Sequence, residues 1–360
     1  MVEVHDRIHT VMIGDCTVGV GQPLFFIAEA GVNHNGDLNY AHRMIDIAAE
    51  AGADAIKFQT FKAEKLNLPN APKATYHVRT TGSDAEQSWF DLLKSQELSA
   101  ADHAELISHC RAKKIIFLST PYDFESVDLL DELGVPAYKV ASTDANNFPF
   151  LRYIAGKGKP VIYSTGMCEW DEVVDAVYVL QQSGCPMPVV MQCTSAYPTA
   201  AENLHLRVIE KYRDELGVIT GFSDHSAESM PIALIVAIGL GASVYEKHFT
   251  LDRALPGPDH AASSTPDELR EMIRAARVAE KALGDPQKRC LDCEKENRDK
   301  LRKSVTAGMR IAAGTTVTLE MLEMKRPGFG LPPGQRDHLL GKKALVDIEA
   351  DSIIEPSMIG

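Results

Sequence analysis

The chain has 360 residues, with 37 Lys or Arg against 50 Asp or Glu, and a formal net charge of −13. A chain of this length buries a large core in one or two domains, and its 45% hydrophobic content excludes a disordered, collagenous or disulfide-scaffold protein. The acidic balance argues against nucleic-acid and anionic-membrane partners, because both require a basic surface. A small anionic substrate stays open, since a local pocket can oppose the global charge.

The N-terminal segment mixes charged and apolar residues, so no secretory signal is expected. The longest apolar run, residues 231–244, is too short to span a bilayer. The seven cysteines are odd in number and scattered, which is typical of reduced thiols in a cytoplasmic protein. Cys290 and Cys293 form the single CxxC pair, and without a second pair we expect no structural zinc site there.

From about residue 20 to residue 285, short β-branched runs alternate with longer amphipathic stretches, as in β/α units around a parallel sheet. Strands are predicted at residues 25–31, 54–60, 115–121, 137–142, 160–166, 189–195, 218–225 and 243–250. Helices are predicted between them, among others at residues 38–51, 99–113, 124–133, 172–182 and 266–283. Eight such units match an α/β fold of the TIM (β/α)8 type better than an open doubly wound sheet.

Two stretches interrupt this alternation. Residues 61–96 are too many for a βα loop and are rich in polar residues, so we expect an excursion over the barrel mouth. Residues 286–302 are charged and poor in apolar side chains, as in a linker or a solvated helix. Residues 303–360 alternate short β-like runs with Gly and Pro turns and predict a small β-rich domain. The predicted organisation is a barrel domain with an N-terminal extension at 1–285, a linker at 286–302 and a small domain at 303–360.

The active site of a TIM barrel lies at the C-terminal ends of its strands, and here those ends are unusually polar. The polar residues at the predicted strand ends are Glu29, Lys57, Gln59, Ser119, Thr120, Lys139, Ser142, Ser164, Thr165, Thr194, Ser195, Tyr197, Ser223, Asp224, His225, Glu246, Lys247 and His248. Thr120 and Ser164 could equally cap the helices that follow them. Lys247 alternates with Glu246 and His248 along its strand, so it is expected to face the helices or the rim.

Two pairs of these residues suggest chemistry. Lys57 and Lys139, aimed at one mouth, would repel each other unless an anion lay between them, which favours an anionic ligand over a structural ion pair. His225 and His248 end neighbouring strands and could hold a divalent metal such as manganese, iron or zinc, although two hydrogen-bonded histidines explain the spacing as well. Cys193 has apolar neighbours and is interpreted as a core thiol rather than a nucleophile. The absence of GxGxxG and GxxxxGK[ST] motifs argues against dinucleotide and P-loop binding.

These residues lie in motifs that resemble the sialic acid synthase family, which includes N-acetylneuraminate, legionaminate and pseudaminate synthases. The motifs, in the family's order, are IAEAGVNHNGD (27–37), GADAIKFQTF (52–61), STPYD (119–123), YKVAS (138–142), STGM (164–167), QCTSAYP (192–198), FSDH (222–225), EKHFTLDR (246–253) and LPGPDHAAS (255–263). Their joint occurrence covers almost the whole chain and is far more specific than any single motif. The segment KRPGFGLPP (325–333) resembles the small antifreeze-like (SAF) domain that follows the barrel in this family.

The resemblance implies an enzyme that condenses phosphoenolpyruvate with an N-acetylated hexose aldehyde, typically N-acetylmannosamine, and water, releasing phosphate and a nine-carbon 2-keto acid. It implies that His225 and His248 ligate Mn²⁺ or Mg²⁺, which polarises the sugar aldehyde. It implies a phosphoenolpyruvate site made of Lys57, Lys139, Thr120, Ser142, Ser164 and Ser223, with Gln59 and Tyr197 lining it. Glu29 would assist proton movement, and Asp259 would contact the sugar hydroxyls. Arg326 would enter the barrel of the other subunit and bind the N-acetyl group, which implies a domain-swapped homodimer.

The motifs leave the acceptor open. Ser195 stands where some bacterial members have Asn, so the contact of that amide with the substrate is in doubt. The TSAYP form resembles animal enzymes that use a 6-phosphorylated sugar, whereas STPYD and FSDH resemble bacterial enzymes that use the free sugar. We expect an N-acetylneuraminate synthase, with legionaminate, pseudaminate and N-acetylneuraminate-9-phosphate synthases as alternatives. A pyruvate-dependent aldolase and a non-catalytic carbohydrate-binding protein are the alternatives from other classes.

Overall fold

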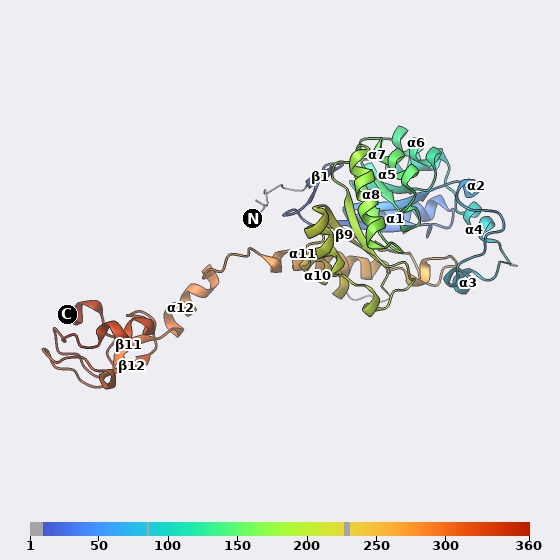
Figure 1. Cartoon of the computed structure of the whole chain (residues 1–360). Helices are drawn as coiled ribbons and strands as arrows, with labels where there is room; N and C mark the ends of the chain where they lie inside the picture. Colours follow the sequence, from blue (N-terminus) through green and yellow to red (C-terminus); the bar gives the residue numbers. More distant parts are fainter. Residues whose placement is uncertain (1–9, 85, 227–230) are drawn as a thin grey trace. The chain divides into compact units, whose positions relative to one another are not determined.

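The computed structural model describes residues 10–84, 86–226 and 231–360 and divides into two compact units, Met1–Gly284 and Asp285–Gly360. The first unit contains eight parallel strands: β3 (Phe25–Gly31), β4 (Ala55–Thr60), β5 (Ile116–Pro121), β6 (Tyr138–Val140), β7 (Val161–Ser164), β8 (Val189–Cys193), β9 (Ile219–Asp224) and β10 (Val244–His248) (Figure 1). They are hydrogen-bonded in the order β5-β4-β3-β10-β9-β8-β7-β6, and the two end strands, β5 and β6, also lie against each other. The sheet is therefore a nearly closed barrel, which confirms the TIM-barrel prediction.

Helices follow the strands and cover the outside of the barrel. They are α1 (Leu38–Ala51), α5 (Ala100–Lys113), α6 (Phe124–Glu132), α7 (Phe148–Ala155), α8 (Trp170–Gln182), α9 (Val208–Lys211), α10 (Ile232–Gly239) and α11 (Pro266–Leu283). Local signals set their ends: the Asp37 side chain accepts from the first backbone N–H groups of α1, and Gly52 ends that helix at φ +87°. A capping box between Thr265 and Glu268 begins α11.

Two apolar layers hold the barrel. The outer layer lies between the strands and the helices, and the inner layer fills the barrel below the polar strand ends. The inner layer consists of Phe25, Ile27, Ala55, Leu118, Ala137, Ile162, Val189, Met191, Ile219 and Val244, joined by Ile13 and Val18. The last two come from an antiparallel hairpin of β1 (Thr10–Ile13) and β2 (Cys16–Gly19), which packs on the residues that begin the strands. This hairpin therefore closes the N-terminal end of the barrel.

The excursion at residues 61–96 contains three short helices, α2 (Ala63–Leu66), α3 (Thr75–Thr81) and α4 (Trp89–Ser95). Tyr76 of α3 stacks on Tyr197 after β8, with ring centroids 5.0 Å apart. Thr80 of the same helix donates a hydrogen bond to the carbonyl of Pro258, 3.3 Å away. The excursion therefore crosses the C-terminal mouth of the barrel, as expected.

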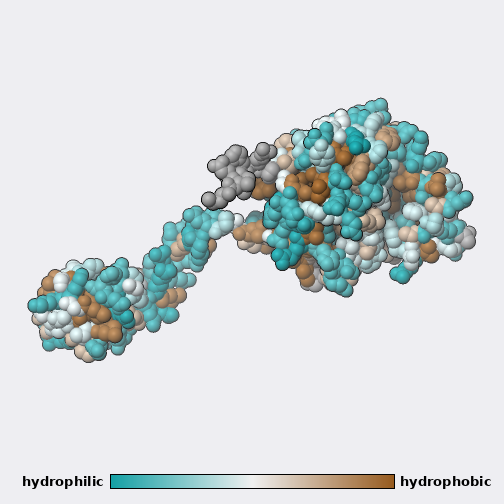
Figure 2. Space-filling view, in the orientation of Figure 1, coloured by the Kyte–Doolittle hydropathy of each residue, from teal (hydrophilic) through white to brown (hydrophobic). Residues whose placement is uncertain are grey.

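The second unit begins with α12 (Lys295–Leu301), whose residues are all exposed, as in a solvated helix. Beyond it, β11 (Ser304–Ala307) and β12 (Leu322–Lys325) pair antiparallel, and isolated β-bridges join the remaining segments. Its core consists of Val305, Ala307, Ile311, Val317, Leu322, Leu339, Ala344, Ile348, Ile354 and Ile359. The face drawn in Figure 2 is largely hydrophilic, with apolar patches on both units. Among the described residues, no helix has both the length and the apolar character needed to cross a membrane.

Candidate active site

A buried cluster of four charged side chains occupies the barrel above its apolar layer. Lys57 Nζ lies 2.8 Å from Glu29 Oε2 and 3.8 Å from Glu246 Oε2, and Lys139 Nζ lies 3.6 Å from Glu246 Oε1. All four residues are at most 4% exposed. The carboxylate of Glu246 therefore lies between the two lysines. The sequence argument expected an anion between these lysines and favoured a ligand, but the chain supplies a carboxylate of its own, so the lysine pair alone does not indicate a bound anion.

Three hydroxyl groups surround this cluster. Lys57 Nζ donates to Thr120 Oγ1 at 2.9 Å, and Lys139 Nζ donates to Ser164 Oγ at 2.7 Å. Ser223 Oγ donates to Glu246 Oε1 at 3.1 Å. Within the described parts of the chain, the other oxygen of this carboxylate, Oε2, has no hydrogen-bond partner although it is buried. A buried acceptor without a partner is typical of a site that is completed by a ligand or by water.

The electrostatics of the cluster differ from those of isolated side chains. Burial raises the pKa of Glu29 to about 7, despite the opposing effect of Lys57. Burial would also raise the pKa of Glu246, but Lys139 and Lys57 outweigh it and hold this pKa at about 2. Burial lowers the pKa of Lys139, whereas for Lys57 the nearby carboxylates outweigh burial and the pKa is raised. With both lysines and Glu246 charged, the cluster is net positive whenever Glu29 is protonated.

Two more hydroxyl groups meet beside the cluster at Gly166. Its backbone N–H donates to Ser142 Oγ at 2.9 Å. A Cβ at this position would overlap Ser195 Oγ and would lie 2.7 Å from Ser142 Oγ. Gly166 is thus required for the close approach of both serines, and the structure brings Ser195 into the site that the sequence predicted.

The two candidate metal ligands, His225 and His248, have ring centroids 5.5 Å apart. His225 Nδ1 lies 2.9 Å from the carbonyl oxygen of Thr194, so it donates to that oxygen and leaves Nε2 as the free lone pair of the neutral ring. Burial lowers the pKa of His248 well below its usual range, and in the described structure its buried Nδ1 has no hydrogen-bond partner. Each of these imidazoles, when neutral, offers a lone pair that could bind a divalent metal.

The chain offers these two nitrogens and little else to such a metal. Among the described residues, no group of three or more His, Cys, Asp or Glu is arranged as a metal site. Catalytic metals commonly keep positions open for water or substrate, so a two-histidine site suits catalysis better than a structural role. Burial opposes the charged form of His225, but Cys193 and the Thr194 carbonyl outweigh it and raise its pKa, so metal binding would have to displace a proton.

The remaining predicted barrel residues surround the histidines. A Cβ at Gly31 would lie 3.3 Å from Glu29 Oε1, 3.5 Å from Gln59 Nε2 and 3.6 Å from His248 Cε1, so these three side chains converge. The Tyr197 ring lies 4.2 Å from the His225 ring and 6.2 Å from the His248 ring, measured between centroids. Asp259 is half-buried on the loop after β10, and burial raises its pKa to about 6.

Lys247 and Asp224 point away from the mouth of the barrel, and Arg326 lies in the other unit. Lys247 lies 3.2 Å from Asp224 on the outer face of the barrel, as its alternation with Glu246 and His248 indicated. Arg326 is exposed directly after β12 in the second unit, so the barrel does not bring it to the mouth by itself.

The sequence reasoning gave two residues of the site no role in it. Glu246 was located at a strand end, and its alternation with Lys247 places it on the same face of β10 as His248, in the mouth. Cys193 is buried, as a core thiol would be, but its sulfur lies 3.5 Å from Ser142 Oγ and 3.7 Å from His225 Nδ1. It therefore belongs to the floor of the site, and no local signal distinguishes it from a core cysteine.

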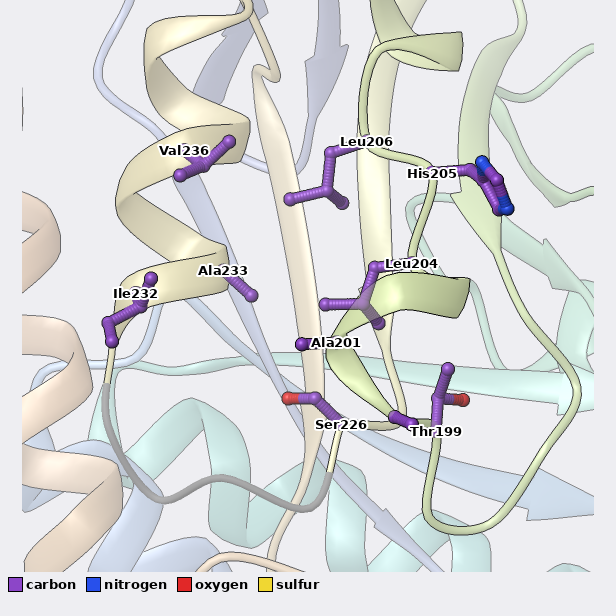
Figure 3. A pocket seen from close by; sticks show the side chains of 10 residues that line it. Thr199, Ala201, Leu204, His205, Leu206, Ser226, Ile232, Ala233 and Val236 are labelled. Carbon is purple, nitrogen blue, oxygen red and sulfur yellow. The ribbon is translucent and has the colours of Figure 1, made fainter.

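A separate hollow of about 340 Å³ lies outside this site, between residues 199–206 and α10 (Figure 3). Leu204, Leu206, Ile232, Ala233 and Val236 supply most of its lining. An apolar lining of this kind does not match the charged cluster in the mouth. The chemistry of the chain is therefore concentrated at the strand ends.

A TIM barrel with buried lysines, carboxylates and histidines at its strand ends, followed by a small β domain, defines this chain as a barrel enzyme with a C-terminal accessory domain. The chain belongs to the NeuB family, whose model matches residues 44–288, and the SAF domain model matches residues 302–360. These matches confirm the family and the fold that the motifs indicated.

Similar proteins are named as synthases. The N,N'-diacetyllegionaminic acid synthase of Campylobacter jejuni is 41% identical, covering 91% of this chain and 98% of that protein. The N-acetylneuraminate-9-phosphate synthase of Mus musculus is also 41% identical, covering 94% and 93%. The structure of an N-acetylneuraminic acid (sialic acid) synthetase from Leptospira borgpetersenii is 33% identical with a TM-score of 0.72, covering 80% of this chain and 94% of that one. The expectation of a synthase enzyme is confirmed, but identity alone does not separate the acceptors.

Proposed function

We propose that this enzyme condenses phosphoenolpyruvate with an N-acetylated hexosamine aldehyde and water, giving a nine-carbon 2-keto acid and phosphate. N-acetylmannosamine is the leading acceptor, which makes the product N-acetylneuraminate. The 2,4-diacetamido trideoxyhexoses of legionaminate and pseudaminate synthesis and the 6-phosphate of N-acetylmannosamine are the alternatives. The observation that carries this proposal is the buried Lys57–Glu246–Lys139 cluster, which hydroxyl groups surround and which lies beside two histidines.

The cluster suits a donor that carries both phosphate and carboxylate. Lys57 and Lys139 provide the positive charge, and Thr120, Ser164 and Ser223 provide hydroxyl groups within hydrogen-bond reach of the cluster. Ser142 and Ser195 extend this set at Gly166. Glu246 holds both ammonium groups in position before the donor arrives. A bound anion would then compete with this carboxylate for them.

The acceptor would lie above the donor, beside the histidines. His225 and His248 would hold a divalent metal, Mn²⁺ or Mg²⁺, which when bound supplies Lewis-acid polarisation of the sugar aldehyde. Tyr197 lies against the ring of His225, and Asp259 would accept hydrogen bonds from the sugar hydroxyls. Gln59 would line the site beside His248.

In the reaction, the enol carbon of phosphoenolpyruvate forms a bond to the aldehyde carbon, the aldehyde oxygen takes the electron pair of its C=O bond and a proton to become a hydroxyl group, and positive charge develops at the carbon that bears phosphate. Water adds to that carbon and loses a proton. The tetrahedral intermediate then loses phosphate by cleavage of the bond between this carbon and the phosphate oxygen, and its new hydroxyl group gives up its proton to become the keto group. Glu29 suits the proton transfers, because its pKa of about 7 lets it accept or give a proton near neutral pH. Its Oε2 pairs with Lys57, and its Oε1 and the His248 ring both lie near Gly31, so Glu29 would lie between donor and acceptor.

The C-terminal unit would complete the mouth from a second copy of the chain. Arg326 is an exposed cation on this unit, and its guanidinium could donate to the carbonyl of the N-acetyl group. We expect Arg326→Ala to raise the KM for the sugar with little change in thermal stability, and truncation after residue 285 to abolish activity. A fully active truncated monomer would contradict the homodimer with a lid supplied in trans.

The test of the reaction is phosphate release in the presence of Mn²⁺ from phosphoenolpyruvate, with each of the three acceptor types in turn. We expect release with one acceptor type and stoichiometric formation of the 2-keto acid. Product formed from pyruvate would identify an aldolase instead. If His225→Ala and His248→Ala leave the function untouched, the chain is a binding protein rather than an enzyme of this type.

A further inference from the structure

The excursion at 61–96 contributes an aromatic side chain to the mouth. Tyr76 of α3 stacks on Tyr197 with ring centroids 5.0 Å apart and an angle of 24° between the planes. Tyr197 in turn lies 4.2 Å from the ring of His225. These contacts form a continuous row of rings from the excursion down to the histidine pair. An aromatic ring placed above a proposed acceptor site is well positioned to contact the acceptor.

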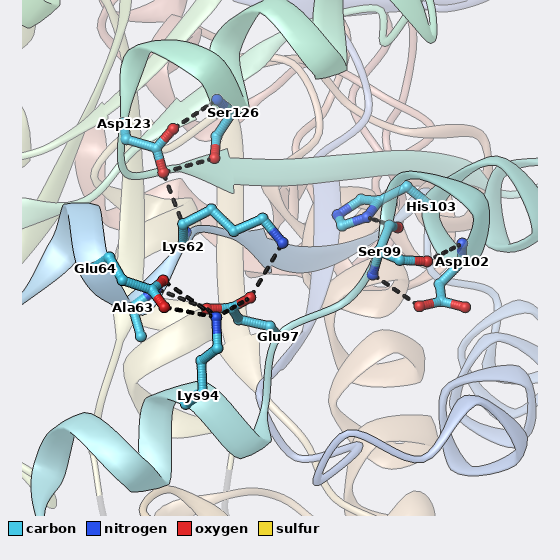
Figure 4. A network of polar contacts seen from close by, with 10 residues as sticks. All are labelled: Lys62, Ala63, Glu64, Lys94, Glu97, Ser99, Asp102, His103, Asp123 and Ser126. Atoms are coloured by element: carbon cyan, nitrogen blue, oxygen red, sulfur yellow. Dashed lines mark hydrogen bonds and ion pairs between the residues drawn. The ribbon is translucent and has the colours of Figure 1, made fainter.

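Polar contacts fix the excursion in this position (Figure 4). At its base, Glu97 accepts from the backbone N–H of Ala63 at 2.7 Å and pairs with Lys62 at 3.1 Å. Lys94 pairs with both Glu64 and Glu97, at 2.8 and 3.1 Å. These contacts join the beginning and the end of the excursion, and the Thr80 hydrogen bond to Pro258 joins α3 to the loop that carries Asp259. Tyr76 is therefore held over the mouth by anchors at both ends and in the middle.

The surroundings of Tyr76 are aromatic and acidic. Burial raises the pKa of Tyr76, and Asp259 raises it further. The hydrogen bond from Thr80 to the carbonyl of Pro258 brings the loop that carries Asp259 to the helix that carries Tyr76. A tyrosine offers an apolar ring to the C–H face of a sugar and a hydroxyl to its polar edge. A carboxylate accepts hydrogen bonds from hydroxyls but repels a phosphate.

We propose that Tyr76 contacts the acceptor sugar and that the wall formed by Tyr76, Tyr197 and Asp259 selects an unphosphorylated acceptor over its 6-phosphate. This inference rests on the proposed condensation and adds the residue that sets the acceptor class. It gives the excursion, rather than the barrel strands alone, control over which sugar is used.

The test is steady-state kinetics with phosphoenolpyruvate and Mn²⁺, using N-acetylmannosamine, its 6-phosphate and the 2,4-diacetamido trideoxyhexoses as acceptors. We expect the wild type to use a neutral sugar with a kcat/KM about a hundredfold above that for the 6-phosphate. Tyr76→Ala should raise the KM for the neutral sugar about tenfold while the KM for phosphoenolpyruvate stays within about twofold. Tyr76→Phe, which keeps the ring, should recover most of this loss. Val78→Ala is the matched control, because Val78 is an exposed residue of the same helix.

The outcomes separate the two proposals. If the wild type releases no phosphate with any acceptor, the proposed function fails and this inference falls with it. If the wild type is active but prefers the 6-phosphate, or if Tyr76→Ala changes both KM values equally or neither, the acceptor role of Tyr76 is refuted while the condensation stands. Near-UV circular dichroism checks the fold of each variant, and Tyr76→Leu provides the same comparison if Tyr76→Ala does not fold.

Discussion

Glu246→Gln tests whether the buried cluster is held together by the carboxylate between its lysines. The change keeps the size of the side chain and removes the charge that lies 3.8 Å from Lys57 Nζ and 3.6 Å from Lys139 Nζ. At an effective dielectric constant of about 20, each contact corresponds to about 4 kcal/mol before desolvation is subtracted. Removing one member of a buried ion cluster costs about 3–5 kcal/mol, because the remaining charges lose their compensation. We therefore expect the melting temperature to fall by about 6–10 °C.

The assay is thermal unfolding followed by near-UV circular dichroism, with and without phosphoenolpyruvate. Glu125→Gln is the control: this exposed carboxylate pairs with Lys65 at 2.9 Å, and because solvent screens the pair, its loss should leave the melting temperature nearly unchanged. Phosphoenolpyruvate should stabilise Glu246→Gln more than the wild type, because the variant has no carboxylate between the two lysines to compete with the ligand. A variant that melts within about 2 °C of the wild type, with the same stabilisation by ligand, would refute this account of the cluster.

Three further outcomes follow from the geometry. Gly166→Ala should raise the KM for phosphoenolpyruvate at least about tenfold, because its Cβ would displace the Ser142 and Ser195 hydroxyls. Gly239→Ala is the control, because no described atom lies within 4 Å of the new Cβ. Equal kinetics for the two variants would count against a role of the two serines in donor binding. The pKa of Glu29 is raised to about 7 in the folded chain, so its contribution to the free energy of unfolding should be present below about pH 4.5 and be lost as the pH rises through 7. Urea unfolding between pH 5 and 8 should show this slope in the wild type and not in Glu29→Gln; parallel curves would contradict it. His248→Ala should weaken Mn²⁺ binding in calorimetry more than tenfold with an unchanged fold, and unaltered binding would remove this residue from the metal site.

Local signals explain which elements the sequence located well. The structure has the same bounds as the prediction for β3, α1 and α11, where a buried run or a pair of caps marks both ends. Strand β6 covers residues 138–140 rather than 137–142, because the chain turns into a 3₁₀ segment at Ser142. Where a strand runs into a loop of the site, the strand predicted from the sequence is thus longer than the strand that is hydrogen-bonded in the sheet.

The site was predictable where it depends on alternation along a strand, and not where it depends on which strands are neighbours. Glu29 and Lys57 face each other because β3 and β4 are paired in register. Glu246 on β10 contacts lysines on β4 and β6, neither of which is hydrogen-bonded to β10, so these contacts depend on the curvature of the whole barrel, which no local pattern states. Tyr76 lies in a stretch without hydrophobic periodicity, so its stacking on Tyr197 could be found only in the folded chain.

The hairpin that closes the N-terminal end of the barrel has a kinetic consequence. Ile13 and Val18 seal that end with the apolar layer above them, so in the described structure both substrates must enter by way of the strand ends. The donor would occupy the deeper position, at the lysines, and the acceptor the outer one, under α3. Binding is then expected to be ordered, with phosphoenolpyruvate first, and a large excess of sugar should inhibit by blocking the path of the donor.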